Sequence, residues 1–235
     1  VLGDGVMGAQ IAGHIANAGI PSLLFEINDS LAKNGVEGLT KLKPAPLFSS
    51  KNTSLVTPCT YDNDLEKLKD CDLIIEAVAE KIEIKHSVYK SLLPHLKDDA
   101  ILASNTSGIP LANLVEVLPD EVQSRFLISH FFNPPRYMRL VEFIVSDKNN
   151  PDTVNFMKNF IYTLFIPFVF LGLTNLQAQE VEEVIVTAEK RSESLQDISQ
   201  AVTVLTAEDI DQKNITTFTD LSAIAPGVTL SLIHI

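Results

Sequence analysis

The stretch that decides the fold is VLGDGVMGAQIAGHIANAGI, residues 1–20, in which residues 3–8 match the pattern GxGxxG. The glycines lead directly into a segment that places Val6, Ile11 and Ile15 on one helical face. Small residues at these spacings let backbone amides at the start of a helix approach a pyrophosphate, whose charge the helix dipole favours. The motif therefore predicts a turn and helix that bind a dinucleotide. A glycine-rich turn in a cofactor-free α/β protein is the alternative.

The residues on either side of this motif support a dinucleotide site. Residues 21–25, PSLLF, read as a second buried strand, and Glu26 follows them. An acidic residue at this spacing would accept hydrogen bonds from the adenosine ribose hydroxyls, which favours NAD over NADP. Only Val1 and Leu2 precede the turn, whereas a strand normally has about five or six residues. The sequence therefore predicts that the chain begins inside its first strand.

Composition limits the possible functions. The 235 residues are 46% hydrophobic, which is enough to bury a core. Lys and Arg number 18 against 30 Asp and Glu, and the resulting net charge of −12 excludes nucleic-acid binding over a broad surface. The two cysteines, Cys59 and Cys71, form no CxxC pair or Cys/His cluster, so we predict neither a disulfide framework nor a metal site.

Two further buried strands end in polar loops. Residues 72–78, DLIIEAV, lead to Glu80 and then to an amphipathic helix over residues 82–96. Residues 101–103 form the next strand and end in SNTSG, residues 104–108. In an open parallel sheet, ligands bind at the carboxyl ends of the strands, where these loops lie. A Ser- and Asn-rich loop is equally typical of turn capping, so this pattern leaves both interpretations open.

A histidine and a glutamate form the candidate catalytic pair. Residues 125–130, RFLISH, predict a fifth strand that ends in His130, and Glu142 lies in the returning apolar run of residues 140–144. A histidine whose tautomer is fixed by a carboxylate can act as a general base, and such a pair would suit removal of a proton from an alcohol. The alternative is a half-buried histidine beside an ordinary glutamate on an edge strand.

The chain changes character after residue 156. Residues 157–179 contain Lys158, an apolar run at 160–173 and Ala178 in the order typical of a secretory signal peptide. The run is shorter than the roughly 20 apolar residues of a membrane-spanning helix, and a buried core helix is the alternative. Residues 180–235 are polar and acidic and read as a small α/β fragment, incomplete at its C-terminus.

Five motifs in order carry a family resemblance: GDGVMGAQIAGHIANAGI, Glu26, IIEAVAEKIEIK, ASNTSG and HFFNPPRYMRLVEFI. Over residues 1 to about 154, the chain resembles the NAD-binding domain of 3-hydroxyacyl-CoA dehydrogenase, especially the bacterial multifunctional fatty-acid oxidation type. The resemblance implies an α/β fold of the Rossmann type, with a doubly wound, mainly parallel sheet. It also implies NAD-dependent oxidation of L-3-hydroxyacyl-CoA to 3-ketoacyl-CoA in fatty-acid β-oxidation.

The same resemblance implies roles for individual residues. His130 would be the base and Glu142 its orienting partner, while Ser107 and Asn133 would hold the reacting oxygen and the nicotinamide side. The residues implied to bind NAD are Gly3, Gly5, Val6, Met7, Gly8, Glu26, Val78, Ala79, Glu80, Lys85, Ser107 and Asn133. Residues 29–60 occupy the place of a helical insertion that approaches coenzyme A. We find no counterpart of the family's helical C-terminal domain, which closes the acyl site and builds the dimer, so we expect efficient turnover and dimerisation to be lost.

From residue 157 the chain resembles a different family, the start of a TonB-dependent outer-membrane receptor. It shows a signal peptide, a TonB-box-like run at residues 183–188 and the opening of a plug domain at 194–231. This resemblance implies export to the periplasm or outer membrane and TonB as a partner, whereas the dehydrogenase part implies a cytoplasmic location. The expected parts are an NAD-binding domain (1–154), a hydrophobic signal-like helix (155–179) and an incomplete α/β plug fragment (180–235). The alternatives to an incomplete dehydrogenase are a receptor N-terminus that serves transport, or a chimera with no single function.

Overall fold

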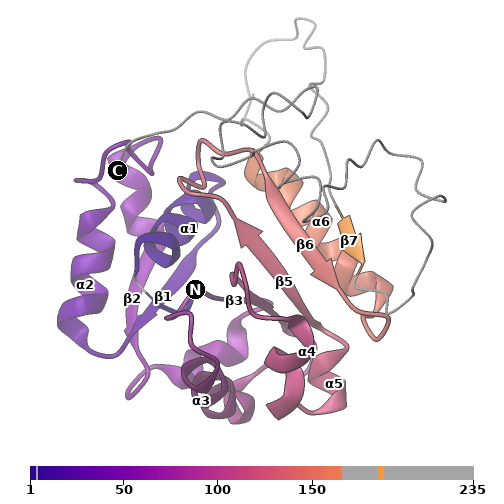
Figure 1. Ribbon diagram of the computed structural model, residues 1–235. Coiled ribbons are helices and arrows are strands. Elements are labelled where there is room, and N and C mark those ends of the chain that lie inside the picture. The colour runs from indigo at the N-terminus through magenta and orange to yellow at the C-terminus, as the bar shows by residue number, and fades with distance from the viewer. Residues whose placement is uncertain (4, 166–184, 188–235) are drawn as a thin grey trace, which may run out of the picture. The chain divides into compact units, whose positions relative to one another are not determined.

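The structure is a computed structural model that describes residues 1–3, 5–165 and 185–187 (Figure 1). The chain divides into two compact units, Val1–Glu189 and Lys190–Ile235, and every described residue belongs to the first. The expected plug fragment and most of the signal-like helix lie outside the described residues, apart from the parts named below.

Helices and strands alternate along the described chain, which is the pattern of an α/β domain. The helices are α1 (Val6–Asn17), α2 (Asp29–Gly38), α3 (Ile82–Leu92), α4 (Leu111–Leu114), α5 (Asp120–Gln123) and α6 (Pro151–Phe165). The strands are β1 (Ser22–Glu26), β2 (Val56–Thr60), β3 (Leu73–Glu76), β4 (Ile101–Ser104), β5 (Phe126–Phe131), β6 (Val141–Val145) and β7 (Ile185–Thr187). Short 3-10 helices are η1 (Ser50–Leu55), η2 (Leu65–Asp70), η3 (Leu93–His95) and η4 (Val115–Val117).

Leu2 joins the strands into one sheet. It forms parallel bridges to Phe25 of β1 and to Glu76 of β3, and its amide donates to the carbonyl oxygen of Ile75 at 2.9 Å. The order across the sheet is therefore β2-β1-Leu2-β3-β4-β5-β6-β7. Neighbouring strands are parallel except β5 and β6, which are antiparallel. This confirms the Rossmann-type, mainly parallel α/β fold that the family resemblance implies.

Helices cover both faces of the sheet. Neighbouring residues of a strand point to opposite faces, so Ile74 and Leu102 join a core cluster with residues of α3, α4 and α5. Ile75 and Ala103 instead join a second cluster with residues of α1 and α6. In Figure 1, α3, α4 and α5 accordingly lie together, apart from α1 and α6. With helices on both faces, ligands of such a sheet bind at the carboxyl ends of its strands.

The expected helical insertion over residues 29–60 is wrong for its last part. Val56–Thr60 form β2, which pairs in parallel with β1, and α2 and η1 precede it. The strand contains Pro58, which has no amide to donate to a ladder and is tolerated only where that side of the strand is unpaired. Because β2 lies at the edge of the sheet, the proline fits there, although it masks the strand in the sequence pattern.

The expected boundary after residue 154 lies inside α6. Met157, Ile161 and Leu164 are buried in the same core cluster as residues of α1, so the described start of the apolar segment is a core helix of the α/β domain. In the described part of the chain, no helix combines the length and apolar character needed to cross a bilayer. Within the TonB-box-like run, residues 185–187 form β7, which pairs in parallel with β6.

His14 is a buried titratable group of α1. Its side chain is 2% exposed, and neither ring nitrogen has a hydrogen-bond partner among the described residues. Burial, assisted by the positive charge of Arg136, lowers the pKa of His14 from 6.5 to about 4. The folded domain therefore holds this imidazole in its neutral form.

His14 is expected to make the fold less stable in acid. Between pH 6.5 and 4 the unfolded chain binds more protons at this site than the folded chain does. The free energy of unfolding therefore falls as the pH falls from 6.5 to 4, by up to about 3 kcal/mol. Above pH 6.5 His14 causes no such loss, because it is neutral in both the folded and the unfolded chain. Urea unfolding at pH 7.5 and pH 4.5 measures the effect. The His14→Leu variant should lose this share of the pH dependence, and an unchanged pH dependence would contradict the assignment.

Candidate functional site

The glycine turn lies at the carboxyl end of the sheet, between the ends of β1 and β3. Gly3 has a φ of +93°, a conformation that side chains rarely adopt, and its amide donates to the carbonyl oxygen of Phe25 at 2.9 Å. A Cβ at Gly8 would lie 1.8 Å from the carbonyl oxygen of Gly3, so only glycine lets α1 start this close to the turn. Among the described residues beyond its chain neighbours, a Cβ at Gly5 would have no atom within 4 Å.

The start of α1 supplies what an anionic ligand needs. Gly5 is the N-cap, and among the described residues no side chain caps this end and no acidic residue lies in the first turn. Its backbone amides and the positive end of the helix dipole therefore remain available to a pyrophosphate. Glu26 ends β1, and its neighbour Ile27 and the first helical residue, Val6, are 66% and 65% exposed. The arrangement supplies the donors and the carboxylate that the predicted contacts to the phosphate and adenosine portions of a dinucleotide require.

Replacing Gly5 with alanine is expected to weaken NADH binding while leaving the fold intact. The backbone angles at Gly5, φ −51° and ψ 174°, are open to alanine, so the free energy of unfolding should change by less than about 0.5 kcal/mol. The added methyl group would occupy the space through which the pyrophosphate approaches the backbone, and we expect about a tenfold rise in Kd. Urea unfolding and NADH fluorescence titration measure the two quantities. Gly38→Ala, at another glycine with open space around it, is the control, and equal affinities for the two variants would contradict the site.

Strands β5 and β6 bring the predicted catalytic pair together. His130 and Glu142 lie directly opposite each other in the antiparallel ladder, and His130 Nδ1 is 2.9 Å from Glu142 Oε2. The side chains are 21% and 41% exposed. Within the described part of the chain, Nε2 has no hydrogen-bond partner, so it can accept a proton if Nδ1 carries the hydrogen shared with the carboxylate. The ring of Phe132 packs against the imidazole, with 4.7 Å between centroids.

Ser107 and Asn133 follow the ends of β4 and β5, and both are exposed. The amide of Ser107 donates to Glu80 Oε1 at 3.2 Å, and Gln10 of α1 donates to Asn133 Oδ1 at 3.2 Å. The structure therefore places both residues at the same edge of the sheet as His130. Each is held by a neighbouring element and has no hydrogen bond to the imidazole among the described residues.

A buried ion-pair network lies beneath the loop that follows β3. The side chains of Glu76 and Lys85 are 0% and 1% exposed, and Lys85 Nζ lies 2.6 Å from Glu76 Oε1. Lys85 Nζ is also 3.2 Å from Glu80 Oε2. Tyr89 and Ser104 each donate a hydroxyl hydrogen bond to Glu76 Oε2 at 2.7 Å. Lys85, which the family resemblance implies as a residue that binds NAD, is thus enclosed between two carboxylates.

Glu80 links the loops that follow β3 and β4. Its Oε1 accepts hydrogen bonds from the Thr106 hydroxyl and from the amides of Ser107 at 3.2 Å and Gly108 at 3.3 Å. Burial alone would raise the pKa of Glu80, but the hydrogen bond from Thr106 and the charge of Lys85 outweigh it and lower the pKa overall. Glu80 is therefore a carboxylate that stays ionised and holds two loops at the site.

Glu76, Gln10 and Asn105 were not predicted from the sequence. Asn105, which follows β4, connects the ends of β3, β4 and β5. Its backbone amide donates to the carbonyl oxygen of Glu76 at 2.7 Å, and its side-chain Oδ1 accepts from the backbone amide of Phe131 at 2.9 Å. Glu76 carries a detectable signal: a carboxylate inside the apolar run of residues 72–78 must find buried partners. Gln10 lies within the helix of the glycine motif and carries no such signal.

Arg136 connects the loop after β5 to the segment that follows α2. Its Nη1 donates to the carbonyl oxygens of Ala45 and Leu47 at 2.6 and 2.9 Å, and its guanidinium lies 4.4 Å from the ring centroid of Phe48 and 5.0 Å from that of Tyr137.

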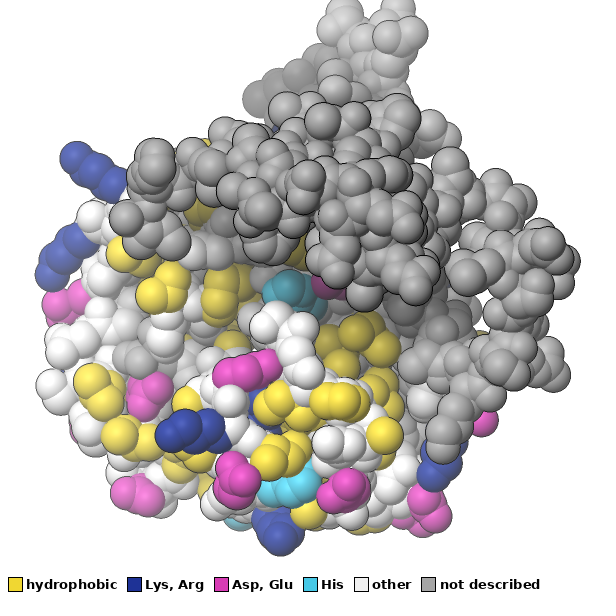
Figure 2. Space-filling view, viewed as in Figure 1, with side chains coloured by type: hydrophobic (Ala, Val, Ile, Leu, Met, Phe, Trp, Pro, Cys, Tyr) yellow, Lys and Arg dark blue, Asp and Glu magenta, His cyan; other side chains and the backbone are white. Residues whose placement is uncertain are grey.

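Figure 2 shows hydrophobic, acidic and basic side chains interspersed over the coloured part of one face, with no continuous basic patch there.

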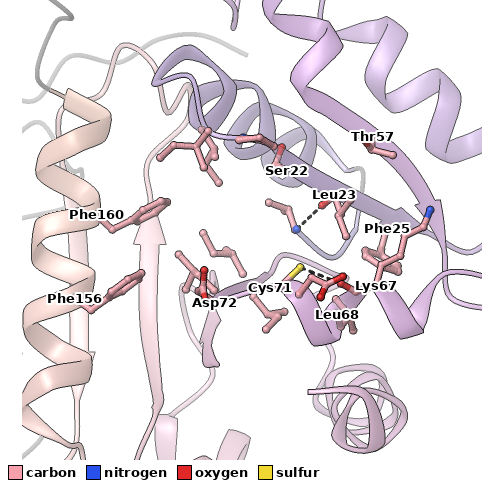
Figure 3. Close-up of a pocket in the computed structure, with 18 residues that line it drawn as sticks. Ser22, Leu23, Phe25, Thr57, Lys67, Leu68, Cys71, Asp72, Phe156 and Phe160 are labelled. Atoms are coloured by element: carbon pink, nitrogen blue, oxygen red, sulfur yellow. Dashed lines mark hydrogen bonds between the residues drawn. The ribbon is translucent and has the colours of Figure 1, made fainter. Parts of the chain in front are cut away.

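A cavity of about 550 Å³ lies at the opposite, amino end of the sheet. The starts of β1 and β3 line it, and Phe156 and Phe160 of α6 face it (Figure 3). It contains none of the site residues predicted from the sequence. Apart from the buried Lys85, those residues instead lie at the carboxyl edge, near the glycine turn and the loops after β3, β4 and β5.

Known proteins are similar to this chain in sequence and in fold. The family profile of the 3-hydroxyacyl-CoA dehydrogenase NAD-binding domain matches residues 1–164, which includes most of α6. Proteins named "probable 3-hydroxyacyl-CoA dehydrogenase" are similar to this chain: that of Bacillus subtilis is 41% identical and that of Deinococcus radiodurans 42% identical, each over 68% of the chain. The chain spans 23% and 48% of their respective lengths. The crystal structure of a 3-hydroxyacyl-CoA dehydrogenase from Archaeoglobus fulgidus matches with a TM-score of 0.60 and 28% identity, covering 79% of this chain and 54% of that one.

Proposed function

Because the chain belongs to the family of 3-hydroxyacyl-CoA dehydrogenase NAD-binding domains, we propose that it serves the oxidation of an L-3-hydroxyacyl-CoA to the 3-ketoacyl-CoA. The observation that carries this proposal is the 2.9 Å contact between His130 and Glu142 at the same sheet edge as the glycine turn. NAD is the cofactor of the family. We place this activity in the cytoplasm, where the substrates of fatty-acid oxidation would be available to it.

The described residues divide the work of holding the cofactor. The amides of the glycine turn would bind the pyrophosphate, and Glu26 would bind the adenosine ribose. Because the Glu26 carboxylate would repel a 2′-phosphate on the adenosine ribose, Glu26 favours NAD over NADP. Val78, Ala79, Glu80, Ser107 and Asn133 would surround the nicotinamide end.

His130 and Glu142 would perform the proton chemistry. When bound, NAD⁺ would accept the hydride that C3 of the substrate loses. His130 Nε2 would take the proton of the C3 hydroxyl as C3 loses its hydride, so that the C3–O bond becomes a carbonyl, and would return the proton in the reverse direction. Glu142 keeps the hydrogen of Nδ1 in place and balances the positive charge that the imidazole acquires.

The full 235-residue chain tests the proposal in two steps. NADH should bind saturably and more tightly than NADPH, as measured by fluorescence titration. Acetoacetyl-CoA should then be reduced slowly, because efficient turnover is expected to be lost, but faster than by the His130→Gln variant, as measured by the loss of NADH absorbance. Absence of saturable binding at millimolar NADH would refute the whole proposal. NADH binding together with a reduction rate no higher than that of His130→Gln would retain the cofactor and refute the reaction.

A second candidate function concerns the segment from residue 157 on. The order of a signal-like run and a TonB-box-like run supports a receptor N-terminus that would be exported and would bind TonB. Cell fractionation followed by N-terminal sequencing tests it. Cleavage after Ala178 would support this function, and an uncleaved chain in the cytoplasmic fraction would refute it.

A further inference from the structure

The buried carboxylate of Glu76 takes no part in the chemistry described above, yet it accepts four hydrogen bonds close to the site. We propose that Glu76 is a positioning residue that fixes the nicotinamide end of the site through Lys85 and Glu80. This inference rests on the proposed function for the identity of the ligand. The contacts that carry it are internal to the protein.

Glu76 is held from several elements at once. Its Oε1 accepts from Lys85 Nζ at 2.6 Å and from the amide of Val78 at 2.9 Å. Its Oε2 accepts from the hydroxyls of Tyr89 on α3 and Ser104 on β4, each at 2.7 Å. Each carboxylate oxygen accepts two hydrogen bonds, and the side chain is 0% exposed. The carboxylate is therefore fixed relative to the sheet and to α3.

Lys85 transmits this position to the site. Its ammonium lies 3.2 Å from Glu80 Oε2, and the other oxygen of Glu80 binds the hydroxyl of Thr106 and the amides of Ser107 and Gly108. The side chain of Glu80 is 45% exposed, so these bonds alone would leave it free to change conformation. A buried cation that Glu76 anchors keeps Glu80 in place, and Glu80 keeps the loop of Ser107 in place.

The two halves of the cofactor distinguish positioning from general destabilisation. ADP-ribose contains the pyrophosphate and adenosine that the glycine turn and Glu26 would bind, and it has no nicotinamide. Loss of positioning should weaken NADH binding and spare ADP-ribose. A merely structural role would affect both ligands alike or neither.

The experiment compares Glu76→Gln with the wild type in the full chain, using NADH fluorescence and ADP-ribose calorimetry. We expect the Kd for NADH to rise about tenfold and the Kd for ADP-ribose to stay within about twofold. Asn149→Ala is the control, because it removes a hydrogen bond to the carbonyl oxygen of Phe126 at the amino end of β5, and it should leave both constants unchanged. Equal weakening of both ligands by Glu76→Gln, or an unchanged Kd for NADH, would overturn the inference.

Tyr89→Phe provides a milder variant in case Glu76→Gln does not fold. It keeps the buried ring and removes one hydrogen bond to Glu76, and we expect the Kd for NADH to rise about threefold. In a Glu80→Ala background the same substitution should have no further effect, because the path through Glu80 is already broken. Additive effects of the two substitutions would overturn the inference.

Amide hydrogen exchange tests the positioning without any ligand. The amides of Ser107 and Gly108 should exchange about tenfold faster in Tyr89→Phe than in the wild type, because their acceptor on Glu80 becomes mobile. If the wild type fails to bind NADH, the proposed function falls, and this measurement still decides the inference. Unchanged exchange at both amides would overturn it.

Discussion

His130→Gln is expected to lower kcat for the reduction of acetoacetyl-CoA by about 10²- to 10⁴-fold and to leave the Kd for NADH unchanged. Glutamine can hydrogen-bond to Glu142, but it cannot gain or release a proton at neutral pH, so the variant removes the acid and base function alone. Steady-state kinetics at saturating NADH measures kcat, and fluorescence titration measures Kd.

A second histidine provides the control for this variant. His86 on α3 contacts the carbonyl oxygen of Asn113 at 2.8 Å and has no part in the proposed chemistry, so His86→Gln should keep the wild-type kcat. An unchanged kcat in His130→Gln would refute the base assignment. A matching loss of NADH affinity would show that His130 holds the cofactor instead.

Lys85→Met is expected to lower the free energy of unfolding by about 3–5 kcal/mol. The variant leaves the carboxylate of Glu76, which is 0% exposed, without its cation. The hydroxyls of Tyr89 and Ser104 remain as donors, but they carry no charge to balance it. Urea unfolding at pH 7.5 measures the loss.

The double variant Lys85→Met with Glu76→Gln tests the cause of that loss. Because the second substitution removes the uncompensated charge, it should recover part of the stability that the first removes. A single variant within about 1 kcal/mol of the wild type, or a double variant with the sum of both losses, would contradict a buried ion pair as the source.

The sequence predicted the fold because its strongest signals are local. The glycine spacing, the helical face of Val6, Ile11 and Ile15, and the apolar runs at 72–78 and 101–103 each determine one element from a few neighbouring residues. The strand β2 escaped prediction because Pro58 contradicts the usual strand pattern. Its position at the edge of the sheet, which makes the proline acceptable, depends on the whole fold.

Contacts between site residues could be predicted where two strands lie side by side, as for His130 and Glu142. They could not be predicted where buried charged side chains meet, as for Glu76 and Lys85. His130 and Glu142 meet because β5 returns as β6, which their spacing indicates. The partners of Glu76 come from α3 and β4, and only the packed structure shows that Lys85 turns inward to meet it. The early part of the signal-like segment was ambiguous for a similar reason, since burial of Met157 and Ile161 against the sheet is a tertiary property.

The most direct test of the central claim is a crystal structure of the full chain grown with NADH. We predict density for the pyrophosphate against residues 3–8 and for the nicotinamide between Ser107 and His130 at the carboxyl edge of the sheet. NADH bound in the cavity lined by Phe156 and Phe160 would contradict the account. So would an empty carboxyl edge in crystals grown with millimolar NADH.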